Sequence, residues 1–502
     1  MRWLAIVCGL ICVASAAHAQ GSLRNYSRDD LNRRTIERRA TEAVIWGIPA
    51  VNYHLVLREM LLKTSGKVNQ VLYWGQPTEW RNQTLMPNTD AINFMVFYNT
   101  MDGGPMVIEV PPSSDAGSIN GSIVNVWQTS LADVGRFGAD KGEGGKYLLL
   151  PPGYSVPPPA GFIALQSDTY GGYAILRSEF ASRAAGDVAK SVAYGKQIRI
   201  YPLARAASPP PTTFTDAGGV LFDATLRYDE SFFLALNEIV QSEPWLARDN
   251  AMIDQLTSLG IIKGKPFEPS GQLQSLLSGA ARLAQATLEA KYDAGLPPFY
   301  GQDSHWTYPV LQDYLNLAKS ASNKSASEKS ASTKMMSAES TLPEQSAYPV
   351  DARGLTFTYG HASLKEPGVG LFYLLAIKDR NGASLDGGTT YRLTVPSNVP
   401  VEQSWSVTAY DRETHAMIRN MPRASRSSRD PDVRKNADGS VDIYFGPETP
   451  KGKDTNWVPT DPQRDFELMF RFYVPKQELF DKAWQLPDTE RFVMTVGSGG
   501  AH

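Results

Sequence analysis

The chain has 502 residues and a formal net charge of −3, and 20% of its residues are charged. This length is enough to bury two or three hydrophobic cores, and the balanced charge lacks the basic excess that a nucleic-acid or anionic-membrane partner requires. Both cysteines, Cys8 and Cys12, lie in the first nineteen residues, so cysteine nucleophiles and cysteine zinc sites are excluded from the rest of the chain.

Residues 1–19 have the pattern of a Sec signal peptide. Arg2 precedes an apolar run, and Ala17-His18-Ala19 matches the small-x-small sequence that signal peptidase accepts. We therefore expect cleavage after Ala19 and a location in the periplasm, or secretion. No later stretch approaches the ~20 continuous apolar residues of a membrane helix, so we expect no stable membrane insertion.

Apolar residues at helical spacing predict a helical N-terminal segment over residues 20–70, interrupted at Gly47-Ile48-Pro49. Short β-branched and aromatic runs, separated by Gly, Pro, Asn and Asp, then predict a β-sandwich domain over residues 71–215. Helical spacing returns in residues 216–317 and predicts a helical module between two β regions.

Residues 318–347 are of low complexity, because Lys-Ser-Ala-Ser recurs every five residues between Lys319 and Lys334. Such a sequence buries too little apolar surface to offset its ordering entropy, and we expect a tether there. Strand patterns dominate again in residues 348–502 and predict a second β domain. The whole pattern predicts a mainly β protein with a helical module.

Several collinear motifs resemble one bacterial family, in which a domain of unknown function numbered 1254 precedes one numbered 1214. The matching motifs cover nearly the whole chain after the signal peptide. They are Met86-Pro87-Asn88-Thr89-Asp90, Gly103 to Val107, Ala132 to Gly135, Gly142 to Tyr154, Trp405 to Asp411, Asn436 to Val441, Asn456 to Thr460 and Arg471 to Pro475.

The resemblance implies an immunoglobulin-like sandwich, a helical middle segment and a C-terminal jelly-roll sandwich. It implies no activity, since both domains are named for an unknown function. The chain departs from the family at Asn93, where a Tyr is usual, and at Ser404, where a Phe is usual. A pocket lined by those aromatic residues would therefore differ in this protein.

Metal sites and common nucleophile motifs find little support in the sequence. Gly-x-Ser-x-Gly at a strand-to-helix turn is missing, as are the glycine patterns of nucleotide-binding loops. The histidines after the signal peptide are not spaced as chelating pairs, and we expect no metal and no cofactor. These histidines are His54, His305, His361, His415 and His502.

The first polar cluster that could act in binding or catalysis combines Arg81 with Asn88 and Asp90. The Asp90 carboxylate is a candidate acid or base, and Tyr98 is its candidate catalytic partner. The alternative is structural, because Asn and Asp side chains often cap turns by bonding nearby backbone amides.

The second cluster combines Asn456 and Trp457 with Arg471 and Tyr473. Period-two alternation from Phe466 to Val474 places Arg471 and Tyr473 on one strand face, opposite the apolar core face. A buried arginine there requires a carboxylate, either from a ligand or from a structural ion pair.

Arg177 poses the same question inside the apolar stretch from Tyr173 to Phe180. Alternation places Glu179 on the same face, so Glu179 is a candidate partner and the ligand hypothesis for Arg177 is weaker.

The leading functional hypothesis is a periplasmic protein that binds a small organic ligand, anionic or aromatic, in a cleft between its β domains. The first alternative is a hydrolase that uses Asp90 with a Tyr or His as an acid-base pair. The second is a structural protein of the envelope. Self-association into a homo-oligomer is left open. An enclosed pocket with convergent polar groups and shifted carboxylate pKa values favours the enzyme, an open aromatic groove favours binding, and the absence of both favours the structural role.

Overall fold

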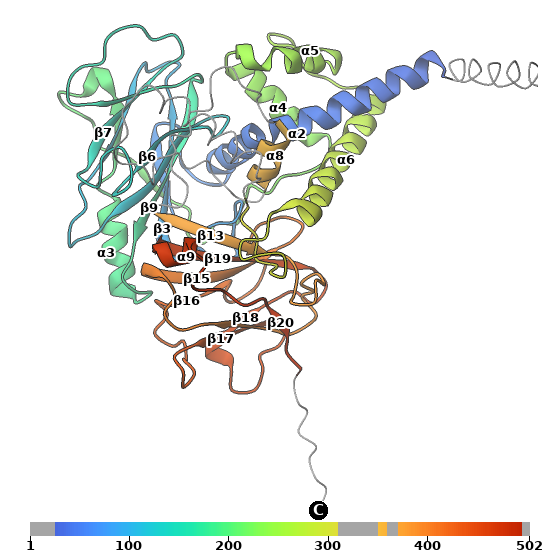
Figure 1. The fold of residues 1–502 in the computed structure, drawn as a ribbon. Helices are drawn as coiled ribbons and strands as arrows, with labels where there is room; N and C mark the ends of the chain where they lie inside the picture. The colour runs from blue at the N-terminus through green and yellow to red at the C-terminus, as the bar shows by residue number, and fades with distance from the viewer. Residues whose placement is uncertain (1–25, 310–349, 359–369, 494–502) are drawn as a thin grey trace, which may run out of the picture.

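The computed structural model describes residues 26–309, 350–358 and 370–493. The expected signal peptide and the Lys-Ser-Ala-Ser repeat lie outside these residues, as do His361 and His502. The described chain is mainly β, with a helical segment in the middle and a β-sandwich at its C-terminal end, which confirms the predicted fold class (Figure 1).

The first described element is one long helix, α2 (Arg28–Lys63). Ser27 caps it by accepting a hydrogen bond from the Asp30 amide. The predicted interruption at Pro49 is wrong, because the helix runs through that proline. From Ala40 onward the helix is largely buried against other elements, and this burial outweighs the roughly 3 kcal/mol that an interior proline costs.

Two facing sheets form the first β region, with strand orders β11-β1-β3-β9-β5-β6 and β10-β4-β7-β8. Alternate side chains of each strand fill the space between the sheets, among them Phe94 and Tyr98. A separate two-stranded ladder pairs β2 with β12. The strands are β1 (Gln70–Tyr73), β2 (Asn82–Gln83), β3 (Ala91–Asn99), β4 (Met106–Val110), β5 (Ile119–Asn125), β6 (Ser130–Val134), β7 (Gly145–Leu150), β8 (Ile163–Gln166), β9 (Gly171–Glu179), β10 (Arg199–Pro202), β11 (Phe214–Asp216) and β12 (Phe222–Asp223).

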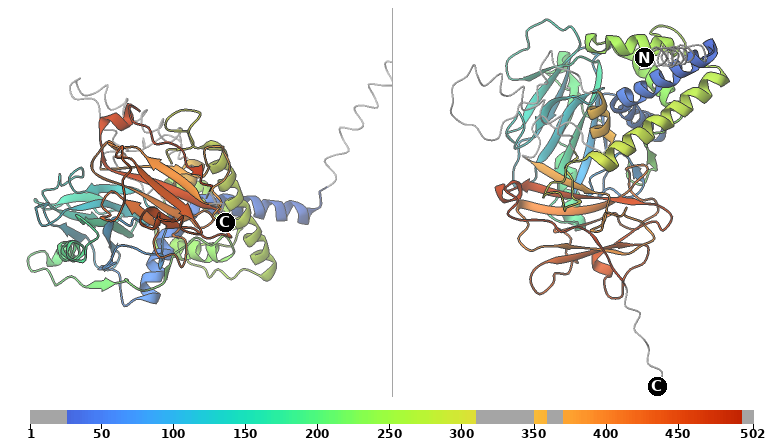
Figure 2. Two further views of the ribbon diagram at one scale, coloured as in Figure 1. Left: turned by 90° about the horizontal axis from the view of Figure 1, so that it is seen from below. Right: turned by 45° about the vertical axis from the view of Figure 1, so that its right-hand side comes forward.

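The middle helices pack with α2 over the outer face of the six-stranded sheet. One hydrophobic core joins these helices to Phe97 and Tyr173 of that sheet and to Tyr410 and Met469 of the C-terminal β region. The helices therefore lie beside both β regions (Figure 2). They are α4 (Ser231–Ser242), α5 (Asn250–Ser258), α6 (Gly271–Gly295) and α8 (Val350–Thr358), and α3 (Ala185–Gly195) packs separately against β3 and β9.

The C-terminal β-sandwich consists of two sheets with orders β13-β19-β15-β16 and β18-β17-β14-β20. The predicted alternation of β19 (Phe466–Pro475) is confirmed, because Phe466, Leu468, Phe470 and Phe472 fill the core between the sheets. The other strands are β13 (Leu371–Ala376), β14 (Tyr391–Val395), β15 (Val401–Asp411), β16 (Ser425–Ser427), β17 (Val441–Gly446), β18 (Trp457–Pro459) and β20 (Glu490–Arg491).

The second face of β19 contacts the N-terminal half of the chain. Arg471 donates a hydrogen bond to the Met86 carbonyl, and the Tyr473 hydroxyl donates one to Asn88. The polar side of the strand is therefore an internal junction between the two β regions. Among the described residues, no helix is both long and apolar enough to cross a bilayer.

Candidate functional site

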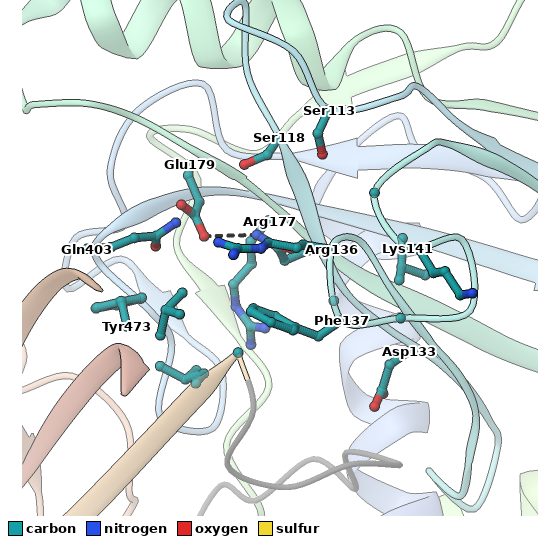
Figure 3. Close-up of a pocket in the computed structure, with 18 residues that line it drawn as sticks. Ser113, Ser118, Asp133, Arg136, Phe137, Lys141, Arg177, Glu179, Gln403 and Tyr473 are labelled. Atoms are coloured by element: carbon teal, nitrogen blue, oxygen red, sulfur yellow. Dashed lines mark hydrogen bonds between the residues drawn. The ribbon is translucent and has the colours of Figure 1, made fainter. Parts of the chain in front are cut away.

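A pocket of about 270 Å³ opens where the two sandwiches meet (Figure 3). We call it the outer pocket. The first sandwich contributes β5, β6, β9 and the loop after β6, and the C-terminal sandwich contributes residues near β13, β15 and β19. Its main side chains are Asn120, Asp133, Arg136, Phe137, Lys141, Arg177, Glu179, Leu371, Gln403, Tyr473 and Val474.

Arg177 points into the outer pocket from β9, beside Phe137 (Figure 3). It lies opposite Asn93 of β3 and Asn120 of β5 on the outer face of the sheet. No hydrogen bond or ion pair joins its guanidinium to another described residue, and its Nε is fully enclosed. Burial lowers the pKa of Arg177, but an arginine remains cationic at neutral pH.

The expected pairing of Arg177 with Glu179 is not formed. Alternation does place both on one face, yet Glu179 accepts a hydrogen bond from Asn120 at 2.8 Å and lies 3.7 Å from Arg429. Residues from other segments bind the Glu179 carboxylate, and Arg177 remains a half-buried cation that faces the pocket.

The other charged groups of the outer pocket are engaged or exposed. Asp133 accepts a hydrogen bond from Ser122 at 2.9 Å. The Arg136 side chain is 63% exposed and lies 3.4 Å from Glu402. Phe137 supplies an aromatic wall, and further apolar contact comes from the C-terminal sandwich. The pocket thus combines a half-buried arginine, which has no ion-pair partner among the described residues, with polar and partly apolar walls.

Asn88, Asp90 and Tyr473 converge beneath this pocket. Tyr473 donates to Asn88 Oδ1 at 2.9 Å, and its hydroxyl lies 3.3 Å from Asp90 Oδ2. Asn88 Oδ1 also accepts from the Asp90 amide, which is the predicted turn-capping bond. The Asp90 carboxylate pairs with Arg183 at 2.8 Å. The cluster therefore has both a turn-forming and an interdomain role.

Arg471 is 3% exposed, and its described partners are uncharged. The guanidinium donates to Thr408 Oγ1, the Met86 carbonyl and the Tyr410 hydroxyl, and no described carboxylate lies within ion-pair distance of it. The Tyr410 hydroxyl in turn donates a hydrogen bond to the carbonyl of Pro87. Neutral oxygens thus take the place of the carboxylate that the strand pattern predicted.

Three other candidates lie away from this junction. Arg81 pairs with Glu79 near the surface. Asn456 and Trp457 bond backbone carbonyls beside β17, in the sheet opposite β19, so the predicted cluster with Arg471 is not assembled.

Tyr98 points into the first sandwich core and donates to the Val124 carbonyl at 3.0 Å. Asp90 precedes the same strand, and eight residues of extended chain span about 27 Å. The proposed Asp90–Tyr98 catalytic pair is therefore not formed.

A second, smaller space lies behind Arg177, between the six-stranded sheet, α2 and α8. This inner chamber measures about 90 Å³ and shares Arg177 with the outer pocket. Three nitrogens on its lining residues are buried without a hydrogen-bond partner: Trp74 Nε1, Asn88 Nδ2 and Arg177 Nε.

Two histidines each contact a carboxylate, but neither lines the outer pocket or the inner chamber. His305 Nδ1 lies 2.9 Å from Asp488, and His415 Nδ1 lies 2.7 Å from Glu467. The described residues contain no group of three or more His, Cys, Asp or Glu side chains arranged to hold a metal ion.

The junction is also shaped by four residues that were not predicted from the sequence: Phe137, Arg136, Arg183 and Arg429. The loop that carries Phe137 is flanked by two of the family motifs, Ala132 to Gly135 and Gly142 to Tyr154. These motifs were the sequence feature that could have indicated Phe137. Arg183 and Arg429 carry no local pattern that separates them from surface arginines.

These features define a protein of two β-sandwiches joined by helices, with a polar and partly apolar pocket at their junction. Residues 68–202 match the family model described as "Protein of unknown function (DUF1254)", and residues 370–477 match "Protein of unknown function (DUF1214)". The chain therefore contains a DUF1254 segment followed by a DUF1214 segment, in the order that its motifs indicated.

Two solved structures resemble the whole chain. The VPA0106 protein from Vibrio parahaemolyticus is 16% identical, with a TM-score of 0.52, and the match covers 91% of this chain and 100% of that one. An uncharacterized protein from Burkholderia cenocepacia is 11% identical, with a TM-score of 0.40 and coverage of 92% and 95%. No curated protein matches the chain. The first similarity establishes a shared fold.

Proposed function

We propose that this protein binds a small organic anion in the outer pocket, with Arg177 as the main anion-binding residue. The observation that carries the proposal is the half-buried guanidinium of Arg177, which faces a pocket built by both sandwiches and has an enclosed Nε without a hydrogen-bond partner among the described residues. A buried charge without a partner is costly, and proteins usually satisfy it with a counter-ion or a ligand.

The walls of the pocket favour an organic anion over an inorganic one. Phe137, Leu371 and Val474 present apolar surface near Arg177. Small-molecule sites commonly combine such walls with a few polar groups that fix orientation. A guanidinium binds a planar carboxylate through two parallel hydrogen bonds, so a carboxylic acid with an apolar body suits this arrangement.

Titration calorimetry and thermal shift with benzoate, phenylacetate, butanoate and butanedioate test the proposal. At least one of these acids should bind the wild-type protein, and Arg177→Gln should weaken that binding by about 100-fold, as expected for loss of a buried charged contact. The melting temperature of the free protein should not fall, because Arg177 has no described partner to lose.

Arg136→Gln is the matched control, since Arg136 lines the same pocket but is exposed and already near Glu402. It should change affinity by no more than about threefold, since exposed charges contribute little. Equal affinity of wild type and Arg177→Gln for every acid that binds would contradict the proposal.

The hydrolase alternative has less support in the geometry. Its acid-base pair of Asp90 and Tyr98 is not assembled, and Arg183 already neutralises the Asp90 carboxylate. We find no described histidine in the outer pocket that could replace Tyr98. Binding without turnover is the function that the arrangement favours.

A further inference from the structure

The inner chamber is a built polar site with an unusual imbalance of donors and acceptors. Trp74 is 4% exposed and Asn88 is 5% exposed, and each has a side-chain N–H with no partner. The third unpaired donor is Arg177 Nε. Buried donors are nearly always paired in folded proteins, so three in one chamber require an explanation.

Several side-chain oxygens around the chamber already accept a hydrogen bond. Gln128 Oε1 accepts from Tyr173, and Asn52 Oδ1 accepts from Gln128. Asn88 Oδ1 accepts from both Tyr473 and the Asp90 amide, so the orientation of its amide group is fixed, with Nδ2 left unpaired. A water molecule needs acceptors as well as donors, whereas an oxygen group that only accepts fits these walls better.

The size of the chamber limits what can enter. At about 90 Å³ it is smaller than the cavity of about 150 Å³ that holds a benzene ring. An aromatic ring is therefore too large, but a carboxylate or a keto group with its carbon fits. The outer pocket, at about 270 Å³, has room for the rest of the molecule.

We infer that the ligand is an organic acid with a second oxygen acceptor, and that this second group enters the inner chamber and accepts hydrogen bonds from Trp74 and Asn88. The inference rests on the proposed function, since Arg177 holds the first carboxylate in the outer pocket. Arg177 lines both spaces, which places the two acceptor groups on either side of one guanidinium.

Three acids of equal chain length separate this inference from its alternatives: butanoate, 2-oxobutanoate and butanedioate. Butanoate bound at Arg177 leaves the donors of Trp74 and Asn88 unpaired. At least one of the other two acids should pair them and bind the wild-type protein about tenfold more tightly, the usual effect of satisfying a buried donor.

Trp74→Phe removes one donor and keeps an aromatic ring, and Asn88→Ala removes the other donor without adding a charge. Both variants should lose the preference for the two-acceptor acid while still binding butanoate. Trp127→Phe is the matched control, because Trp127 Nε1 is also buried and unpaired but Trp127 does not line the chamber. It should retain the preference.

The possible failures are distinguishable. If the acids bind and depend on Arg177, but wild type shows no preference or both chamber variants keep it, the inference is overturned and the proposed function stands. If a chamber variant does not fold, the other variant decides the result. If none of the three acids binds wild type, the inference falls; the benzoate and phenylacetate titrations with Arg177→Gln still decide the proposed function.

Discussion

Arg177 and Arg471 lie on the facing sheets of the junction but are held differently. Arg471 donates to three neutral oxygens from β15 and from the segment before β3. Arg177 has no described partner. Arg471 therefore joins the two sandwiches, whereas Arg177 is the residue that we propose as the anion-binding group.

Arg471→Met should lower the free energy of unfolding by about 2–4 kcal/mol, because it leaves the buried Met86 carbonyl and Thr408 hydroxyl without their donor. Urea denaturation of the ligand-free protein measures the loss. Arg380→Met, at a side chain that is 71% exposed, is the control and should change stability by less than about 0.5 kcal/mol. A similarly small change for Arg471→Met would show that the contact to Met86 does not stabilise the junction.

We expect His415 to make the folding stability of the protein fall as the pH becomes alkaline. Burial alone lowers the pKa of His415, but the carboxylates of Glu467 and Glu289 outweigh burial and raise the pKa to about 9. The folded state then holds a proton that the unfolded chain releases near pH 6.5. The stabilisation is therefore complete below about pH 6.5 and is lost as pH rises through 9, with a total on the order of 3 kcal/mol.

Denaturation of wild type and His415→Gln between pH 6 and 9.5 tests this titration. Stability of the wild type should fall across the window, and the difference between the two proteins should shrink as pH rises. Parallel curves for wild type and variant would show that His415 keeps its ordinary pKa.

At the scale of elements, the regular periodicities were predicted well and the irregular positions poorly. The alternation of β19 follows from its sequence, since every second residue between Phe466 and Phe472 is apolar. The break expected at Pro49 of α2 is not formed. The local cost of proline is readable from sequence, but the burial that offsets it is tertiary.

The packing of α8 on α2 depends on Gly354. A Cβ at this position would lie 2.7 Å from the Ile45 carbonyl oxygen, so Gly354→Val forces the two helices apart. We expect a loss of about 1–3 kcal/mol in unfolding free energy, measured by urea denaturation. Gly279→Ala, in an open stretch of α6, should instead stabilise by about 0.5–1 kcal/mol. A neutral Gly354→Val would show that α8 can shift without cost.

For the whole molecule, the sequence predicts that the signal peptide is cleaved from the chain before folding is complete. The mature protein should begin at Gln20, because Ala17-His18-Ala19 follows an apolar run typical of a signal peptide. Mass spectrometry of protein purified from a periplasmic extract measures this end. Recovery of a chain that retains Met1 would reject both the cleavage and the proposed periplasmic location.

The order of β, α and β regions was readable from the sequence, because periodicity and turn residues act over a few neighbours. Several candidate residues were also found, among them Asn88, Arg177 and Tyr473. Only the tertiary structure decided which of them meet, since 385 positions separate Asn88 from Tyr473. In the tertiary structure, Glu179 contacts Asn120 and Arg429, and Arg471 is surrounded by neutral oxygens. A strand pattern specifies the face on which a side chain lies, but its partner comes from the element docked against that face.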